Sequence, residues 1–358
     1  MFSYIRKIDL GLLLPAVLLS ISGLAVISSA TPELVYQQII WVVFGVCVFL
    51  FLAAIDIRPL IERRSVVFEI YAAAVILLVA TLFLAPAIRG ARSWIVLGPV
   101  HIQTSELAKV ALIILLSYFF AKRHIGIAHV GNIFVALVYF LAPMALVMLQ
   151  PDLGSALIVA GIFAGYLFVS GLRPRHIAVG IVVAAILGGF AWTSFLKDYQ
   201  KERILGLFYP DRDPLGINYN VIQSKIAIGS GGFWGKGLHQ GTQVQLGFLP
   251  ESQTDFVFAA LVEEWGLFGG IVTIAAFLFL VLRIGLIGIS AHNNFSKFFC
   301  LGVMMVFLLH FFFNMGSTMA LLPVIGVSFP FLSYGGSNLL INFLLVGIIQ
   351  SIASRSSF

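Results

Sequence analysis

The stretch PESQTDFVFAALVEEWGLFGGIVTIAAFLFLVL, residues 250–282, passes from a polar segment that ends at Thr254 into an apolar run that begins at Phe256. As a helix, this run is long enough to cross a hydrocarbon core about 30 Å thick. Asp255 therefore stands at the mouth of a predicted membrane helix, where ionisable groups are functional candidates. A second reading is a helix-capping aspartate, because Asp is favoured at the first turn of a helix.

Similar apolar runs recur along all 358 residues, of which 60% are hydrophobic and 10% charged. Soluble domains carry about 25% charged residues, so the composition predicts an all-α integral membrane protein. No segment between the runs is large enough for a soluble domain, and we predict one polytopic membrane domain, residues 1–358. The ten predicted spans are residues 10–28, 36–55, 66–86, 105–121, 132–149, 153–171, 176–195, 256–282, 298–314 and 337–353.

The basic residues predict the orientation of these spans. The short connections 29–35 and 315–336 contain no Lys or Arg, whereas the alternate connections contain basic groups such as Lys122 and Arg123. By the positive-inside rule, both termini lie in the cytoplasm. The net charge of +6 follows from this topology and does not indicate nucleic-acid binding. Residues 196–254 become one large extracytoplasmic loop, whose apolar residues, such as Trp234 and Phe248, predict packing on the helix ends or in the interface.

Several basic residues lie on the predicted outer side, against this trend. Arg92 precedes the fourth span, and Arg203, Arg212 and Lys225 lie in the large loop. Long loops escape the positive-inside rule, so ordinary solvated charge is one reading. The other is a basic surface suited to a phosphate-bearing headgroup.

Other polar groups fall within or beside the predicted spans. Glu106 and Lys109 lie three residues apart on one face of the fourth span, where a structural salt bridge is one reading. Asp152 lies between the fifth and sixth spans, and Ser333 belongs to a Pro- and Gly-rich segment before the last span. Backbone N–H and C=O groups of an irregular segment at membrane depth need hydrogen-bond partners from protein or from a water-filled cavity. Because these groups share the outer half with Asp255, they predict one polar site there.

Glu263 and Glu264 follow Asp255 along the eighth predicted span. On a straight helix they would lie about 12 Å deeper in the membrane than Asp255. We therefore expect them to stay outside its pocket.

Five segments together resemble the shape, elongation, division and sporulation family. They are GARSWIVLGPVHIQTSELAK (90–109), LQPDLGSA (149–156), NYNVIQSKIAIGSGGFWGKG (218–237), PESQTDFVFAALVEEWG (250–266) and LLPVIGVSFPFLSYGGS (321–337). The resemblance implies ten transmembrane helices and a peptidoglycan glycosyltransferase that polymerises lipid II during cell elongation. It also implies a site on the outer face of the bacterial inner membrane and a class B penicillin-binding protein, a monofunctional transpeptidase, as partner.

The same resemblance implies that Asp255, the aspartate of the TDF motif, is the catalytic carboxylate. Two positions depart from the family pattern: Ser93 separates Arg92 from Trp94, where members often place arginine directly before tryptophan, and Thr104 replaces a proline. Neither departure removes a charged group.

A mechanism follows as a hypothesis. Lipid II carries an alpha-linked pyrophosphate and the polymer linkage is beta, which implies inversion by one in-line displacement with Asp255 as base. Glu106 and Asp152 would orient a lysine or bind a divalent cation, Mg2+ or Mn2+, which the sequence does not specify. The predicted pyrophosphate-binding cations are Lys109, Arg92, Arg203, Arg212 and Lys225. A lipid II flippase or other transporter is the alternative, since it would need the same headgroup site, and a non-catalytic scaffold is a third reading.

Overall fold

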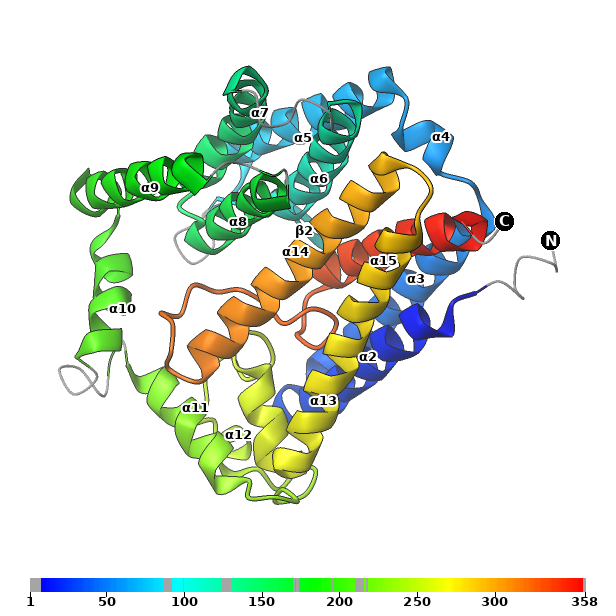
Figure 1. Ribbon diagram of the computed structural model, residues 1–358. Helices are drawn as coiled ribbons and strands as arrows, with labels where there is room; N and C mark the ends of the chain where they lie inside the picture. The colour runs from blue at the N-terminus through cyan, green and yellow to red at the C-terminus, as the bar shows by residue number, and fades with distance from the viewer. Residues whose placement is uncertain are drawn as a thin grey trace.

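The computed structural model describes residues 8–86, 92–98, 100–123, 130–169, 171, 174–194, 196–209, 216 and 218–356. In this part of the chain the protein is a bundle of long helices with one two-stranded hairpin (Figure 1). The predicted all-α multi-pass membrane class is confirmed.

The helices are α2 (Leu10–Ala30), the 3-10 helix η1 (Pro32–Leu34), α3 (Val35–Ala54), α4 (Arg58–Ile61), α5 (Arg64–Leu84), α6 (Thr104–Lys122), α7 (Val130–Leu149), α8 (Leu153–Val169), α9 (Pro174–Ser194), α10 (Asp198–Phe208), α11 (Tyr219–Ser230), α12 (Thr242–Gln245), α13 (Val257–Ser290), α14 (Asn294–Thr318) and α15 (Gly336–Ser356).

Each predicted span overlaps one helix, although α13 is interrupted at Gly266 and runs on to Ser290. Among the described residues, eight helices are long and apolar enough to cross a membrane, or nine if the bent pair α9 and α10 counts as one span. The apolar helix α8 is shorter, at 17 residues. The predicted orientation of the spans stays a prediction.

The helices differ in how deeply they are buried, and this locates the core. α6 and α15 are buried over 78% and 72% of their most apolar stretch, whereas α5 and α7 are buried over 22% and 17%. Large apolar side chains on the outer helices, such as Phe83 and Phe134, are 74% and 65% exposed. Lipid can cover such side chains. Glu106 and Lys109 on α6, in contrast, lie inside the protein rather than against lipid.

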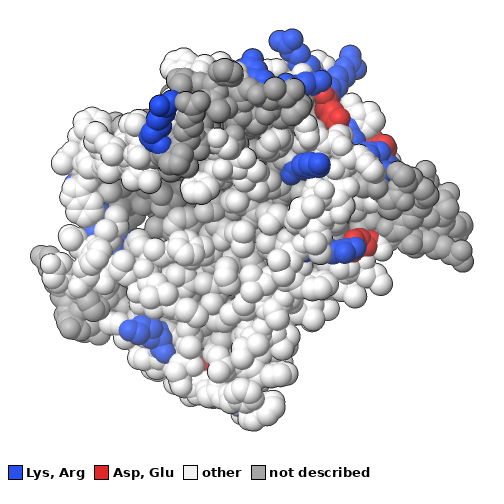
Figure 2. Space-filling view, viewed as in Figure 1, with Lys and Arg blue, Asp and Glu red and all other residues white. Residues whose placement is uncertain are grey.

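Charged side chains avoid most of the face shown in Figure 2 and gather mainly at its upper right, where Figure 1 places α4. In that region Arg58 donates to Asp56 at 2.9 Å and holds the pKa of the Asp56 carboxyl below its ordinary value. An uncharged surface with charges at its margin is typical of a protein that sits in a bilayer.

A hairpin precedes α6 and was absent from the predictions. Strands β1 (Trp94–Leu97) and β2 (Val100–Gln103) pair antiparallel, with Trp94 opposite Gln103. The β-branched residues on both sides of Gly98, whose φ is 61°, are the signal that favours this hairpin. The Thr104 amide donates to the Ser93 carbonyl at 3.1 Å, so the hairpin fixes the start of α6.

The predicted large loop contains α10, α11 and α12, of which α11 and α12 pack on the helix ends as the apolar residues predict. Ser224 on α11 donates to the Thr318 carbonyl at the end of α14, at 2.8 Å. Gln245 on α12 donates to the Ser29 carbonyl near the end of α2, at 3.0 Å. These contacts make residues 219–245 an ordered cover over the ends of α2 and α14.

Gly266 divides α13 into two helical pieces, because its φ of 71° and ψ of −174° are not helical. Glu263 and Glu264 belong to the piece before this break, and their contacts contradict the prediction that they lie deeper than Asp255. Glu264 accepts a hydrogen bond from Ser29 at the end of α2, and Glu263 accepts one from Lys236 at 2.7 Å. Both carboxylates lie beneath the cover formed by residues 219–245.

Candidate active site

Asp255 lies directly before α13 and is half-buried. The N-cap of α13 is Phe256, so the structure does not use Asp255 in the capping role that its sequence position also allowed. The Asn314 side chain on α14 donates to the Asp255 carbonyl at 2.9 Å. The backbone that carries the carboxylate is thus tied to the core of the bundle.

The segment 319–335, here called the core loop, joins α14 to α15 without regular secondary structure. Ser333 donates to the Thr254 carbonyl at 2.7 Å, and the Tyr334 amide donates to the Gln253 carbonyl at 2.8 Å. The core loop therefore holds the two residues before Asp255 in place. Ser333 thus bonds to the backbone beside Asp255, and its predicted contact with substrate stays a prediction.

Two further contacts define the course of the core loop. Gly326, at φ 71°, lies beside the carboxylate, since a Cβ built there would be 3.9 Å from Asp255 Oδ2. The Tyr334 hydroxyl donates to Gln37 Oε1 at 2.8 Å, and burial raises the pKa of this phenol above its ordinary value. The phenol therefore stays protonated near neutral pH and keeps its hydrogen bond to α3.

Glu106 and Lys109 form the predicted salt bridge inside the bundle. Lys109 Nζ lies 2.7 Å from Glu106 Oε1 and 2.9 Å from His310 Nε2. Glu106 is 4% exposed, Lys109 2% and His310 3%. The pairing compensates the charges, and the burial of Lys109 shields its ammonium from solvent in this conformation. A direct contact between Lys109 and pyrophosphate stays a prediction.

His310 was missed by sequence reasoning. The stretch FLLHFFFN, residues 307–314, reads as an apolar span. The available signal was the spacing of His310 and Asn314, which puts two polar side chains on one face of α14.

Asp152 organises a neighbouring junction. Its carboxylate accepts from Gln103 Nε2 and from the Ser155 amide, each at 3.0 Å. Ser105 also approaches it, at 3.4 Å, and Ser105 adjoins Glu106 at the start of α6. Asp152 thereby joins β2, α6 and α8, which fits a structural role beside the Glu106 pair.

The predicted cations are distributed over two regions. Arg92 is exposed at the base of the hairpin, and its amide donates to the Gln150 carbonyl at 3.3 Å. Arg203 and Lys225 both line a pocket between α10, α11 and the core loop. Arg212 lies outside the described residues.

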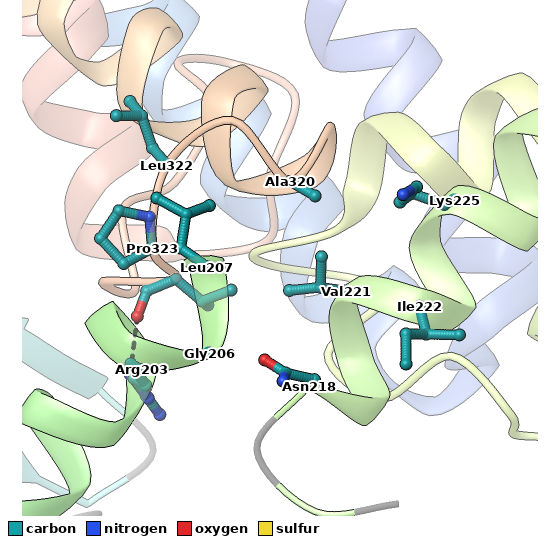
Figure 3. Close-up of a pocket in the computed structure, with 11 residues that line it drawn as sticks. Arg203, Gly206, Leu207, Asn218, Val221, Ile222, Lys225, Ala320, Leu322 and Pro323 are labelled. Carbon is teal, nitrogen blue, oxygen red and sulfur yellow. Dashed lines mark hydrogen bonds between the residues drawn. The ribbon is translucent and has the colours of Figure 1, made fainter. Parts of the chain in front are cut away.

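This pocket has a volume of about 240 Å³ and combines cations with an apolar wall (Figure 3). Arg203 donates to the Val324 carbonyl at 3.0 Å, and Lys225 is exposed on the opposite side. Val324 lies two residues before Gly326, so one short stretch of the core loop borders both the pocket and Asp255. The other residues that line the pocket are Gly206, Leu207, Asn218, Val221, Ile222, Ala320, Leu322 and Pro323. Such a lining suits an amphiphile that carries phosphate.

Within the described residues, no group of three or more His, Cys, Asp or Glu side chains is arranged to hold a metal ion. The predicted Mg2+ or Mn2+ stays a prediction.

The fold and the site together define a multi-pass helical membrane protein with an acidic group and a basic pocket joined by the core loop. The family model for FtsW, RodA and SpoVE, described as a cell cycle protein, matches residues 4–357. The chain belongs to this family, as the five sequence segments predicted.

Two curated relatives illustrate the match. The peptidoglycan glycosyltransferase MrdB of Escherichia coli (strain K12) is 42% identical over 285 residues, which cover 79% of this chain and 76% of MrdB. A probable peptidoglycan glycosyltransferase FtsW of Geobacter metallireducens is 35% identical over 366 residues, covering 98% of this chain and 96% of the relative.

Solved structures share the fold over nearly the whole chain. A chain from a peptidoglycan synthase complex, described as coordinating polymerization and crosslinking, superposes with a TM-score of 0.84 at 32% identity and covers 98% of both chains. The rod shape determining protein RodA of Thermus thermophilus gives a TM-score of 0.72 at 27% identity, also over 98% of both chains.

Proposed function

We propose that this chain is a peptidoglycan glycosyltransferase that polymerises lipid II into glycan strands during cell elongation. Family membership and the names of the two curated relatives support this activity. The structural observation that carries the proposal is the placement of Asp255. Its carboxylate lies beside Gly326, and the same stretch of the core loop borders a pocket that contains Arg203 and Lys225.

The proposed reaction is one in-line displacement at the anomeric carbon of the donor sugar. The acceptor 4-hydroxyl attacks this carbon, and Asp255 takes the hydroxyl proton as general base. The new bond is a beta-1,4 linkage, and the broken bond joins the anomeric carbon to pyrophosphate. The electron pair leaves with undecaprenyl pyrophosphate, whose negative charge Arg203 and Lys225 would stabilise. The apolar wall of the pocket suits the start of the lipid chain.

We place the protein in the bacterial inner membrane with the site facing the periplasm. The distribution of basic residues supports this orientation. A class B penicillin-binding protein is the proposed partner, because a structural relative belongs to a complex described as coordinating polymerization and crosslinking.

The test is glycan formation from labelled lipid II by the purified chain in liposomes, with and without the cognate penicillin-binding protein. We expect polymer from the wild type and none from a folded Asp255→Ala variant. Movement of lipid II across the bilayer without any polymer, in every lane, would instead support the flippase alternative.

A further inference from the structure

His310 joins two parts of the site that are far apart in sequence. Its Nε2 lies 2.9 Å from Lys109 Nζ, and its Nδ1 lies 3.1 Å from the Ser328 carbonyl oxygen. An ammonium group can only donate, and a carbonyl oxygen can only accept. Nδ1 therefore carries the hydrogen, and Nε2 accepts from Lys109. His310 is a neutral bridge between α6 and the core loop.

Asn314 lies one turn further along α14 and continues this arrangement. Its side-chain amide donates to the Val327 carbonyl at 2.8 Å and to the Asp255 carbonyl at 2.9 Å. His310 and Asn314 thus hold two successive carbonyls of the core loop. The residue before them is Gly326, which lies beside the Asp255 carboxylate. The stretch 326–328 is consequently fixed between α14 and Asp255.

We propose that His310 is a positioning residue, which ties Lys109 to residues 326–328 and thereby sets the surroundings of the Asp255 carboxylate. This inference rests on the proposed glycosyltransferase function. A buried histidine with only a packing role needs no partners on two separate elements. Here both ring nitrogens of His310 have partners, Lys109 on α6 and the Ser328 carbonyl in the core loop. The Lys109 ammonium that contacts His310 is also paired with Glu106.

The proposal predicts a kinetic signature. His310 is 3% exposed and Lys109 is 2% exposed, so both are shielded from solvent in this conformation. Loss of the bridge should therefore lower kcat and leave KM nearly unchanged. Small displacements of a catalytic group reduce rates by up to about 100-fold, and we expect a loss of that order for His310→Phe.

Three variants separate the two arms of the bridge. His310→Asn keeps a donor near the position of Nδ1, and His310→Gln keeps an acceptor near the position of Nε2. His310→Phe keeps the ring shape and loses both. We expect Asn and Gln to retain intermediate kcat values. Tyr166→Phe is the matched control, because it removes a buried hydroxyl that bonds to Ser117 and to the Phe298 carbonyl, outside the site.

Coupling through Lys109 is tested by the double variant Lys109→Met with His310→Phe. If both act through one bridge, the double variant should be no slower than the slower single variant, since groups that act as a unit are non-additive. If the decrease in kcat of the double variant equalled the product of the decreases in the two single variants, the two residues would act independently, and the proposed bridge would be wrong.

Hydrogen exchange of the amides in residues 326–335 gives a readout that does not depend on activity. We expect faster exchange in folded His310→Phe and wild-type exchange in Tyr166→Phe. Unchanged exchange and unchanged kcat in folded His310→Phe, Asn and Gln would overturn the proposal. Absence of polymer from the wild type would instead refute the proposed function, while the exchange comparison would still decide whether His310 orders the core loop.

Discussion

At the scale of single residues, the buried pair Glu106 and Lys109 is the most demanding feature of the bundle. Removing one partner of a buried ion pair leaves the other charge uncompensated, at a cost of about 3–5 kcal/mol, whereas replacing both partners together is often nearly neutral. We expect Lys109→Met to lower the thermal midpoint of the purified protein sharply. The double variant Glu106→Gln with Lys109→Met should recover much of this loss. A double variant less stable than Lys109→Met would show that the pair does not behave as one unit.

The pocket makes a separate prediction for single charges. Arg203→Gln and Lys225→Gln should each raise the KM for lipid II by roughly tenfold, the lower end of what a charge-assisted hydrogen bond contributes. Added salt should reduce the difference in KM between these variants and the wild type, because the pocket is open to solvent. Lys297→Gln is the control, since Lys297 is an exposed cation near the opposite end of α14. If Arg203→Gln and Lys225→Gln had the same KM for lipid II as Lys297→Gln, the pocket would not be part of the lipid II site.

Sequence reasoning singled out the charged groups of the candidate site but not His310 and Asn314, for a physical reason. A charge in an apolar span is costly, so Glu106, Lys109 and Asp255 are conspicuous. A neutral histidine or asparagine in such a span resembles ordinary core. The importance of His310 and Asn314 comes from their partners on the core loop, whose course the sequence does not specify.

At the scale of elements, Gly266 determines how α13 meets the cover formed by residues 219–245. A Cβ at this position would lie 2.2 Å from the Phe233 carbonyl oxygen, and the backbone conformation is one that only glycine adopts readily. We expect Gly266→Ala to lose at least about 1–3 kcal/mol of stability from backbone strain alone. Gly188→Ala is the control, because a Cβ there meets no atom within 4 Å.

Thermal unfolding in detergent and limited proteolysis of the cover would measure this difference. A Gly266→Ala protein as stable as Gly188→Ala would contradict the backbone break. The same glycine explains why the depth of Glu263 and Glu264 was mispredicted. Hydropathy identifies an apolar helix, but it does not show that the helix changes direction at Gly266.

At the scale of the whole molecule, the apolar helices were predictable because most of them are long and apolar; eight or nine in the described part of the chain can cross a membrane, and the predicted count of ten stays a prediction. The predicted orientation rests on the basic connections. In a chain without Cys47 and Cys300, we expect Trp234→Cys to react with a membrane-impermeant maleimide added outside cells. Leu60→Cys should react only after permeabilisation. These positions are 74% and 54% exposed on the protein surface, so neighbouring side chains do not block labelling. The reverse pattern would invert the proposed topology and place the site in the cytoplasm.

The central claim is that Asp255 acts as the base that activates the acceptor. The most direct test compares lipid II binding and single-turnover polymerisation in the wild type and in Asp255→Asn, which keeps the shape of the side chain. We predict wild-type lipid II affinity with a rate lowered about 10²–10⁴-fold, the range for loss of a general base. Polymerisation by Asp255→Asn at the wild-type rate would contradict the account.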